Sequence, residues 1–187
     1  MRRVVLASLL LATPALLGGC LEFGGPLVDH HDEAIGDESE GESETDAGVS
    51  DCGPTVGIVD YAVDGDTLVL TSGERVRLIL VDTPETTKGK HECWGDHATQ
   101  FTANLVSGRE IRLEYDEECL DIYGRLLAYV SVDGVEVNRT LLEQGEACLL
   151  YIPPNGMDRV FQYQELEQAA RNAGMGMWGE CAPVPCE

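Results

Sequence analysis

Three short β-strands joined by tight turns, between residues 55 and 83, constrain the fold more than any other feature of this sequence. Asp64-Gly65 and Ser72-Gly73 are residue pairs typical of hairpin turns. Thr67–Thr71 is rich in β-forming residues, and Arg75–Val81 has the pattern of one continuous strand with apolar residues on both faces. Strands linked so closely pair with their sequence neighbours, so an antiparallel β-meander is predicted.

The next segment contains one helical pattern followed by two strands. Apolar residues recur at helical spacing from Ala98 to Leu105, and Gly108 is expected to end that helix. Glu110–Tyr115 and Arg125–Val132 have strand patterns. These two strands bring the predicted total to five.

Two further helices are predicted towards the C-terminus. Asn138 is expected to cap a short helix that ends at Gly145. Asp158 and Gly174 are expected to cap the last helix, whose apolar face is formed by Tyr163, Leu166, Ala170 and Ala173. This order of elements predicts an α+β fold, a five-stranded barrel of the oligonucleotide/oligosaccharide-binding (OB) type with three packed α-helices.

Residues 1–19 are predicted to be an export signal. The apolar run from Val4 to Leu17 is fourteen residues long and follows two arginines, whereas a membrane-spanning helix needs about 20 apolar residues. The run Leu17-Gly18-Gly19-Cys20 resembles the lipobox of bacterial lipoproteins, which implies lipidation of Cys20. The alternative is an ordinary signal peptide cut nearby, with Cys20 left as a thiol.

Residues 20–51 are predicted to be a disordered acidic tether. Ten acidic residues and no Lys or Arg lie between Asp29 and Asp51, among Gly, Ser and Thr. Such a segment repels itself and buries little apolar surface. His30 and His31 could bind a divalent ion, but histidines in a flexible tether are expected to be solvated.

Residues 52–187 are predicted to form one acidic folded domain. They hold 10 Lys and Arg against 23 Asp and Glu, in a chain whose formal net charge is −22. A domain with this charge balance is not expected to hold nucleic acid by general basic attraction.

The folded domain also carries an even number of cysteines, which are Cys52, Cys93, Cys119, Cys148, Cys181 and Cys186. In an exported domain this predicts three disulfides, whose pairing the sequence leaves open. The alternative is a zinc site made by His91, Cys93 and His97 with one more cysteine. The absence of a Cys-x-x-Cys pair from the sequence argues against zinc.

Two acidic motifs are predicted to meet at one end of the meander. Asp66 precedes the second strand and Asp82 ends the third, and antiparallel pairing brings these ends side by side. Two carboxylates and a nearby carbonyl form a site of the Ca²⁺ type. Taken alone, Asp64-Gly65-Asp66-Thr67 is explained by a hairpin turn, and the Asp82 motif by the end of a strand.

Two arginines lie on the strands next to these carboxylates. Arg77 precedes Asp82 on the same strand, and Arg125 opens a later strand. Guanidinium groups bind phosphate oxygens in pairs, and two of them beside a cation suit a phosphorane-like transition state. The alternative for each arginine is an ion pair on an acidic surface.

Five sequence runs, in this order, resemble the staphylococcal nuclease (thermonuclease) family: AVDGDT, RLILVDTPET, CWGDHAT, DIYGR and VNRTLLEQGEA. The similarity covers Thr55–Glu180. It implies an OB-fold barrel and a Ca²⁺-dependent endonuclease that hydrolyses DNA or RNA to 3′-phosphate and 5′-hydroxyl products. The expected substrate is single-stranded or flexible nucleic acid, no obligate protein partner is implied, and the lipobox places the enzyme as a membrane-anchored periplasmic or cell-surface lipoprotein.

The resemblance also implies the metal ligands. Asp66 and Asp82 match the carboxylate ligands of Ca²⁺, and Thr83 matches the residue that contributes its main-chain carbonyl. Asp64 lies beside them and is expected to support the site through the ligands.

The remaining catalytic and binding roles follow in the same way. Glu85 resembles the general base that orients or deprotonates the attacking water. Arg77 and Arg125 resemble the arginines that hold the scissile phosphate. Tyr123 and Tyr151 match tyrosines that line the nucleotide pocket.

Two departures from the family pattern affect substrate binding more than chemistry. Ile122 stands where the family has a lysine, and a second pocket tyrosine falls at or near Pro153. The segment after Glu85 carries only Lys88 and Lys90 as basic residues. A non-catalytic OB module that binds nucleic acid or protein is therefore kept as an alternative, together with a Ca²⁺-binding structural lipoprotein.

Overall fold

The computed structural model describes residues 49–86 and 89–186, so the predicted leader, Cys20 and residues 20–48 of the predicted acidic tether lie outside the described residues, whereas residues 49–51 begin the described part with a short strand and a turn. The strands are β1 (Val49–Ser50), β2 (Gly53–Pro54), β3 (Val56–Ala62), β4 (Thr67–Leu70), β5 (Arg75–Leu78), β6 (Leu80–Asp82), β7 (Glu110–Leu120), β8 (Leu126–Val132), β9 (Val135–Glu136) and β10 (Cys148–Leu150). The helices are α1 (Gly95–Val106), α2 (Val137–Glu143), α3 (Val160–Ala173) and α4 (Met177–Glu180). None of the described helices is long and apolar enough to cross a membrane.

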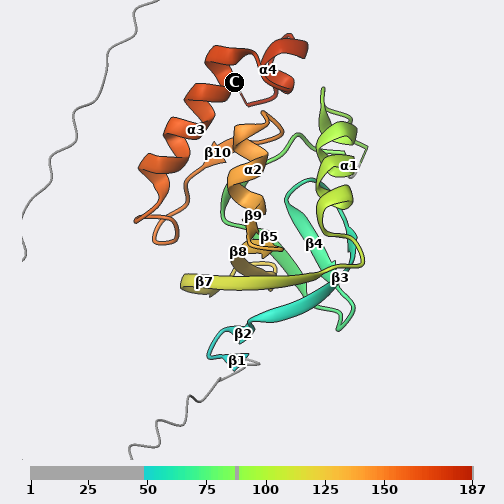
Figure 1. The fold of residues 1–187 in the computed structure, drawn as a ribbon, viewed down its shortest axis with the longest axis vertical. Helices are drawn as coiled ribbons and strands as arrows, with labels where there is room; N and C mark the ends of the chain where they lie inside the picture. The colour runs from blue at the N-terminus through green and yellow to red at the C-terminus, as the bar shows by residue number, and fades with distance from the viewer. Residues whose placement is uncertain (1–48, 87–88, 187) are drawn as a thin grey trace, which may run out of the picture. The chain divides into compact units, whose positions relative to one another are not determined.

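The central structure is a closed five-stranded barrel with three packed helices, as predicted (Figure 1). Strands β3, β4 and β5 form the predicted antiparallel meander, and β7 and β8 extend it on the other side of β3. A parallel pairing of β5 with β8, in which Val76 lies opposite Leu126, closes the barrel. Helix α1 packs on β3, α2 on β8 and α3 on α2, and the additional single-turn helix α4 follows α3.

The prediction of one continuous strand over Arg75–Val81 is wrong, because the chain leaves the barrel at Ile79. Leu80 has a left-handed backbone with φ of 64°, which ends β5 and starts β6 in a new direction. The Ile79 N–H donates to the carbonyl of Ala128, and its carbonyl accepts from the side chain of Asn138 at 2.9 Å. Strand β6 pairs with β10, outside the barrel sheet that contains β5.

Two of the predicted helix caps are also wrong. Asn138 lies inside α2, whose N-cap is Glu136, because its buried amide bonds the barrel backbone instead of the helix end. Asp158 does not cap α3, because the carbonyl of Gly156 accepts the backbone N–H groups that precede and begin that helix. The predicted C-cap of α3 is confirmed, since Gly174 has a left-handed φ of 61°.

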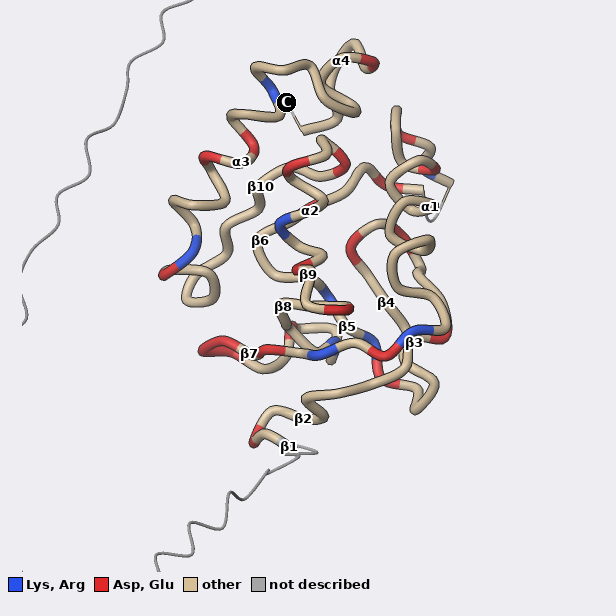
Figure 2. Tube along the Cα trace, viewed as in Figure 1, with Lys and Arg blue, Asp and Glu red and all other residues tan. Residues whose placement is uncertain are grey.

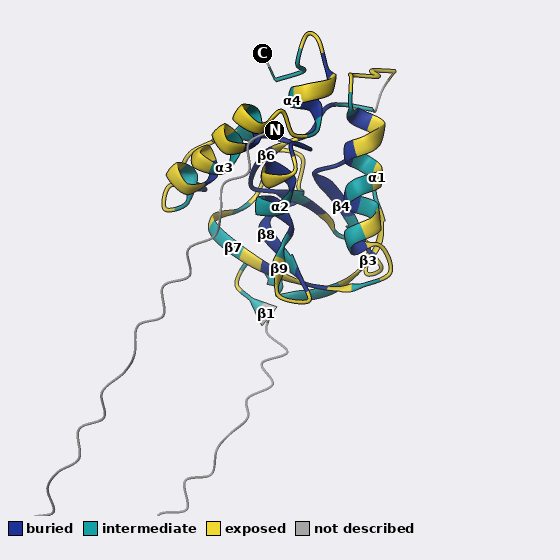
Figure 3. Ribbon diagram, turned by 45° about the horizontal axis from the view of Figure 1, so that its top comes forward, coloured by how far each residue is buried: buried dark blue, intermediate teal, exposed yellow. Residues whose placement is uncertain are grey.

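The core fills the barrel and the space beneath the helices. Buried residues from β4, β5, β8 and α2 form one continuous apolar cluster, and α3 adds the fully buried Tyr163. The outward face of α3 is exposed, as Figure 3 shows. The barrel and its helices therefore support the residues at the end of the barrel where β4 begins and β5 ends.

The structure pairs all six cysteines of the folded domain, as Cys52–Cys119, Cys93–Cys181 and Cys148–Cys186. Because Cys93 is bonded to Cys181, the alternative zinc set that included it is not assembled. In the described part of the chain, no three His, Cys, Asp or Glu side chains form a group that could hold a metal ion.

Candidate active site

The turn between β3 and β4 buries the carboxylate of Asp66. The Asp66 N–H donates to the Asp64 side chain at 3.2 Å, which shapes the turn. A β-carbon on Gly65 would lie within 2.8 Å of side-chain atoms of Thr83, so glycine allows this close approach. From α1, the buried Thr102 hydroxyl donates to the carbonyl of Gly65 at 2.7 Å. Helix α1 and Thr83 thus hold the turn in place.

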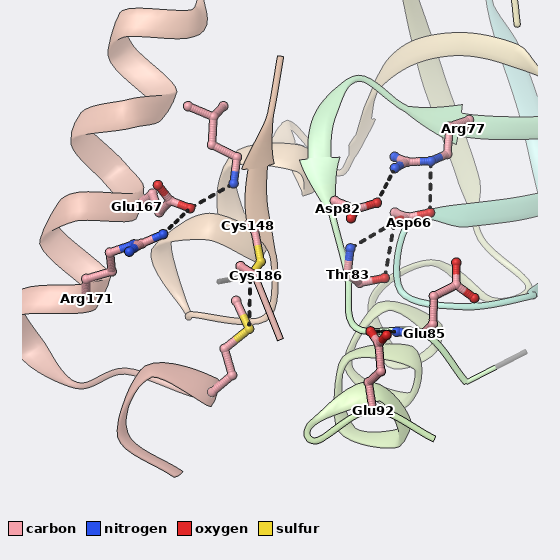
Figure 4. Close-up of a disulfide and its surroundings, with 12 residues drawn as sticks. Asp66, Arg77, Asp82, Thr83, Glu85, Glu92, Cys148, Glu167, Arg171 and Cys186 are labelled. Carbon is pink, nitrogen blue, oxygen red and sulfur yellow. Dashed lines mark hydrogen bonds and ion pairs between the residues drawn. A yellow bond between two sulfur atoms is a disulfide. The ribbon is translucent and has the colours of Figure 1, made fainter. Parts of the chain in front are cut away.

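Asp66 contacts Thr83 and Arg77 directly and is connected to Asp82 through Arg77, and all three are residues that the sequence predicted for the site. Its Oδ2 accepts from the N–H of Thr83 at 2.9 Å and from the Thr83 hydroxyl at 3.2 Å. Its Oδ1 lies 3.1 Å from Nε of Arg77, whose Nη2 lies 2.8 Å from Oδ1 of Asp82. Figure 4 shows Arg77 bonded to both carboxylates and Thr83 bonded to Asp66. Asp66 and Asp82 therefore lie at one site, bridged by Arg77, although Asp82 comes from β6 and not from the end of the third meander strand as predicted.

Arg77 is further fixed by the break in its strand. Its Nη1 donates to the carbonyls of Leu78 and Val81, both at 2.6 Å. These carbonyls flank the point where β5 ends and β6 begins. The guanidinium therefore stabilises the strand break that carries Asp82 towards Asp66.

Negative charge exceeds positive charge in this group of side chains. Burial, and then the charge of Asp66, raises the pKa of Asp64 to about 6. Partial withdrawal from water and repulsion by Asp66 also raise the pKa of Asp82, although Arg77 opposes the change. Asp66, Asp82 and the main chain of Thr83 are hard oxygen donors, and a divalent cation such as Ca²⁺ suits such an acidic set.

Glu85 follows this group on the segment between β6 and α1. Its N–H donates to Oε2 of Glu92 at 2.9 Å, and the N–H of Glu92 donates to its carbonyl at 3.0 Å. The charges of both glutamates contribute to the raised pKa of Asp82. The structure therefore brings the predicted general base near the predicted metal ligands.

Arg125 is held at the start of β8 by an aspartate-centred turn. Asp121 Oδ1 accepts the backbone N–H groups of Tyr123 and Arg125, at 2.8 and 2.9 Å. Its Oδ2 accepts from Nε of Arg125 at 2.6 Å. Nη1 of Arg125 also donates to the Thr67 hydroxyl at 3.4 Å, and that hydroxyl donates to Asp66 at 3.0 Å. Thr67 thus connects the second predicted arginine to the predicted metal ligand.

A cavity of about 390 Å³ opens beside both arginines. Arg77 and Arg125 contribute its polar edge. Much of the rest of the wall is apolar and comes from Leu120, Ile122, Leu127, Leu150 and Ile152. Such a wall suits the flat apolar face of an aromatic or nucleobase ring, with an anionic group at the arginines.

The two predicted pocket tyrosines are placed differently. Tyr123 lines the cavity, and its ring lies 5.5 Å from the Arg125 guanidinium. Tyr151 is not among the lining residues, although its neighbours on either side are. Ile122 forms part of the wall and is almost fully exposed, and Pro153 does not line it.

Three residues that support the site have no role in the sequence-based prediction. Asp121 accepts a hydrogen bond from Arg125 and so orients it. Glu92 accepts the backbone N–H of Glu85. Asn155 bonds both the N–H and the carbonyl of Glu118 at the cavity wall. Asp121 had a usable signal, because an aspartate three residues before Gly124 is typical of a side-chain-stabilised turn. Glu92 acts across seven residues and Asn155 across 37, and no local pattern indicates either contact.

Comparisons with known proteins agree with this arrangement. A model described as "Staphylococcal nuclease homologue" matches residues 75–180. The chain is 38% identical over 129 residues to the SPbeta prophage-derived endonuclease YokF of Bacillus subtilis (strain 168), covering 65% of this chain and 43% of that protein. It is 39% identical over 133 residues to the endonuclease YncB of the same organism, covering 67% and 63%. It is 36% identical over 126 residues to a thermonuclease of Staphylococcus intermedius, covering 65% and 74%.

The chain spans less than two thirds of the length of both Bacillus relatives. The family model, in contrast, covers more than half of the present sequence and includes Arg77, Asp82, Glu85 and Arg125. On this evidence, together with the barrel and its helices, the chain belongs to the staphylococcal nuclease homologue family.

Proposed function

We propose that this protein is a Ca²⁺-dependent phosphodiesterase that hydrolyses DNA or RNA internally and leaves 3′-phosphate and 5′-hydroxyl ends. The observation that carries this function is the arrangement of Arg77 and Arg125 at one cavity, with Thr67 linking Arg125 to Asp66. The names of the relatives, endonuclease and thermonuclease, support the same activity.

The residues present fit a bound calcium ion. Asp66 and Asp82 would hold it with their carboxylates and Thr83 with its main-chain carbonyl, all of which are hard oxygen ligands. When bound, the ion supplies positive charge that offsets these carboxylates and attracts an anionic phosphodiester.

The chain's own side chains then carry out the hydrolysis. Glu85 orients the attacking water and accepts its proton as the water oxygen bonds to phosphorus. The bond from phosphorus to the 5′ oxygen breaks, that oxygen takes a proton from solvent to become the 5′-hydroxyl, and Glu85 releases its proton to solvent. Arg77 and Arg125 bind the non-bridging phosphate oxygens, whose negative charge grows in the transition state.

Two other functions account for less of the site. A non-catalytic OB module needs a binding surface, but it does not need Asp66, Arg77, Asp82, Glu85 and Arg125 together. A calcium-binding structural protein would use the carboxylates, but it would not need Arg125 fixed by Asp121 at the cavity edge. The complete set therefore favours the enzyme.

The central experiment incubates the purified protein with a single-stranded DNA oligonucleotide, either with Ca²⁺ or with excess chelator. We expect cleavage only with Ca²⁺, and mass spectrometry of the products should find 3′-phosphate and 5′-hydroxyl ends. Asp82→Ala should lose both calcium affinity, measured by calorimetry, and activity, with an unchanged circular dichroism spectrum. Full cleavage in excess chelator would contradict the calcium site.

We also propose that Cys20 carries a lipid anchor and that the acidic tether holds the exported domain away from the membrane. The lipobox-like sequence and the short apolar run before it support this location. Membrane fractionation and mass spectrometry of the mature N-terminus test it. Cys20→Ser should release the protein into the soluble fraction, and release of the unaltered protein would contradict the anchor.

A further inference from the structure

The backbone of Glu85 is hydrogen-bonded to Glu92 and packs closely against Gly95. The side chain of Glu92 accepts a hydrogen bond from the N–H of Glu85 (Figure 4), and the N–H of Glu92 donates to the carbonyl of Glu85. Gly95 begins α1, and a β-carbon there would lie 3.1 Å from the carbonyl oxygen of Glu85 and 3.0 Å from that of Pro84. We call residues 92–95 the support segment.

The support segment is itself anchored to distant parts of the chain. Cys93 is bonded to Cys181, 88 residues later, just after α4. The indole N–H of Trp94 donates to Oε2 of Glu146 at 2.8 Å, and the side chain of Glu146 is only 4% exposed. His97 binds the same carboxylate oxygen at 2.9 Å. Both anchors lie on the C-terminal half of the fold.

The backbone of the support segment shows that these anchors restrain it. Trp94 has a left-handed φ of 75°, a conformation that residues other than glycine rarely adopt unless their surroundings hold them. Its ring packs against a small buried cluster of Cys148, Met177 and Cys181, separate from the barrel core. The segment next to Glu85 is therefore fixed by contacts that do not involve the barrel core.

We infer that the Cys93–Cys181 disulfide and the Trp94–Glu146 hydrogen bond are a positioning device for Glu85, acting through Glu92 and Gly95. This role rests on the proposed nuclease function, in which Glu85 must place a water molecule in line with the phosphate. Displacing a catalytic group by about 1 Å can lower a rate by about 10²-fold. A disulfide that restrained only the unfolded chain would change stability without acting through Glu85.

A kinetic double-mutant cycle separates these two roles. We expect Cys93→Ser with Cys181→Ser to lower kcat on a short oligonucleotide by at least about 10-fold, with KM nearly unchanged. In a Glu85→Gln background the same two changes should lower kcat no further, because the positioned group is already lost. The matched control removes Cys52–Cys119, and any loss of kcat that it causes should be equal in both backgrounds.

Two results would overturn the positioning role. One is wild-type kcat without the Cys93–Cys181 bond, and the other is an equal loss of kcat in the wild-type and Glu85→Gln backgrounds. If the protein without this bond does not fold, Trp94→Phe replaces it in the cycle, because this change removes the indole N–H together with part of the ring and leaves the disulfide in place. A smaller but Glu85-dependent loss of kcat is then expected, and a loss independent of Glu85 refutes the role.

The hydrogen bond to Glu92 gives a second test. Glu92→Ala should lower kcat by at least about 10-fold, whereas Glu92→Gln, whose amide oxygen still accepts the Glu85 N–H, should restore most of it. Equal activity of the two variants would contradict the contact.

A readout independent of activity keeps this inference separate from the nuclease proposal. Amide hydrogen exchange at Glu85 should accelerate at least about 10-fold when the Cys93–Cys181 bond is removed, because its N–H donates to Glu92. Unchanged protection refutes the positioning role even in an active enzyme. A protein that shows this acceleration but cleaves no nucleic acid refutes the proposed function instead.

Discussion

Arg77 and Arg125 reach the same cavity, but their surroundings hold them in different ways. Arg77 bonds two carboxylates and the carbonyls at the strand break, so it supports both the fold and the site. Arg125 is bonded mainly by Asp121, in a turn at the start of β8. The two arginines should therefore differ when they are replaced, although both are proposed to bind phosphate.

Arg125→Ala should lower kcat by about 10²-fold or more and cost less stability than Arg77→Ala, because it loses mainly its ion pair with Asp121 at the cavity edge. Arg125→Lys should be almost as slow, since a lysine cannot form the paired bonds of a guanidinium. Arg77→Ala should lower both kcat and stability. Steady-state kinetics and urea unfolding measure these effects, and near-wild-type turnover of Arg125→Ala would refute its phosphate-binding role.

Asp121 should make stability depend on acidic pH. Burial raises the pKa of Asp121, but hydrogen bonds from the backbone and guanidinium of Arg125 and from the N–H of Tyr123 outweigh burial and leave the pKa below its usual value. A carboxyl whose pKa is lowered by folding stabilises the fold above its unfolded pKa of about 3.9. This contribution is lost as the pH falls through the folded pKa.

Asp121→Asn should therefore be less stable than the unaltered protein at pH 6, and the difference should shrink as the pH falls below about 4. Urea unfolding across this range measures it. A difference that stays constant down to pH 2.5 would show that the carboxylate charge is not responsible.

At the scale of elements, helix α1 controls the turn that carries Asp66. Thr102→Val keeps the side-chain shape but leaves the buried Gly65 carbonyl without its hydrogen bond, at a cost of about 1–3 kcal/mol. We expect weaker calcium binding as well, because Asp66 follows Gly65 directly. Thr140→Val is the matched control, since its hydroxyl donates to the carbonyl of Glu136 at the start of its own helix, α2. Equal effects of the two changes on calcium affinity would contradict a special role of α1.

At the scale of the whole molecule, the proposed nuclease combines an acidic domain with a polyanionic substrate. Figure 2 shows acidic residues along most elements, with a continuous acidic stretch at one end of β7. Several arginines of the described part are already paired, as Arg109 is with Asp133, Arg139 with Glu143 and Arg171 with Glu167. Short-range contacts at Arg77, Arg125 and the proposed calcium site must therefore act against long-range repulsion.

Activity should consequently depend only weakly on salt. Long-range repulsion is screened beyond about 10 Å at 0.1 M salt, whereas contacts inside the site are screened less. We expect kcat/KM on a short oligonucleotide, at saturating Ca²⁺, to hold or rise from low to moderate NaCl. A steep fall from the lowest salt concentration, as many phosphate contacts would cause, would indicate a basic binding track.

The sequence by itself determined the meander and the barrel class, and it predicted the residues of the proposed site. Turn pairs such as Asp64-Gly65 and the period of apolar residues are local signals, because they reflect the conformational preferences of a few neighbouring residues. The resemblance to a known family, carried by short runs in a fixed order, added the roles of Glu85 and Arg125. Local pattern and motif order were sufficient for these features.

Only the tertiary structure decided where the strand after Arg77 breaks, how the cysteines pair and what fixes the catalytic groups. Asn138 binds the carbonyl of Ile79 across 59 residues, and Cys93 bonds Cys181 across 88. Whether such partners meet depends on how the whole chain packs, since each distant contact must offset the entropy of closing a long loop. A local sequence pattern does not reflect that balance. The pattern around Asn138 therefore predicts a helix cap, whereas its amide is buried against the barrel backbone.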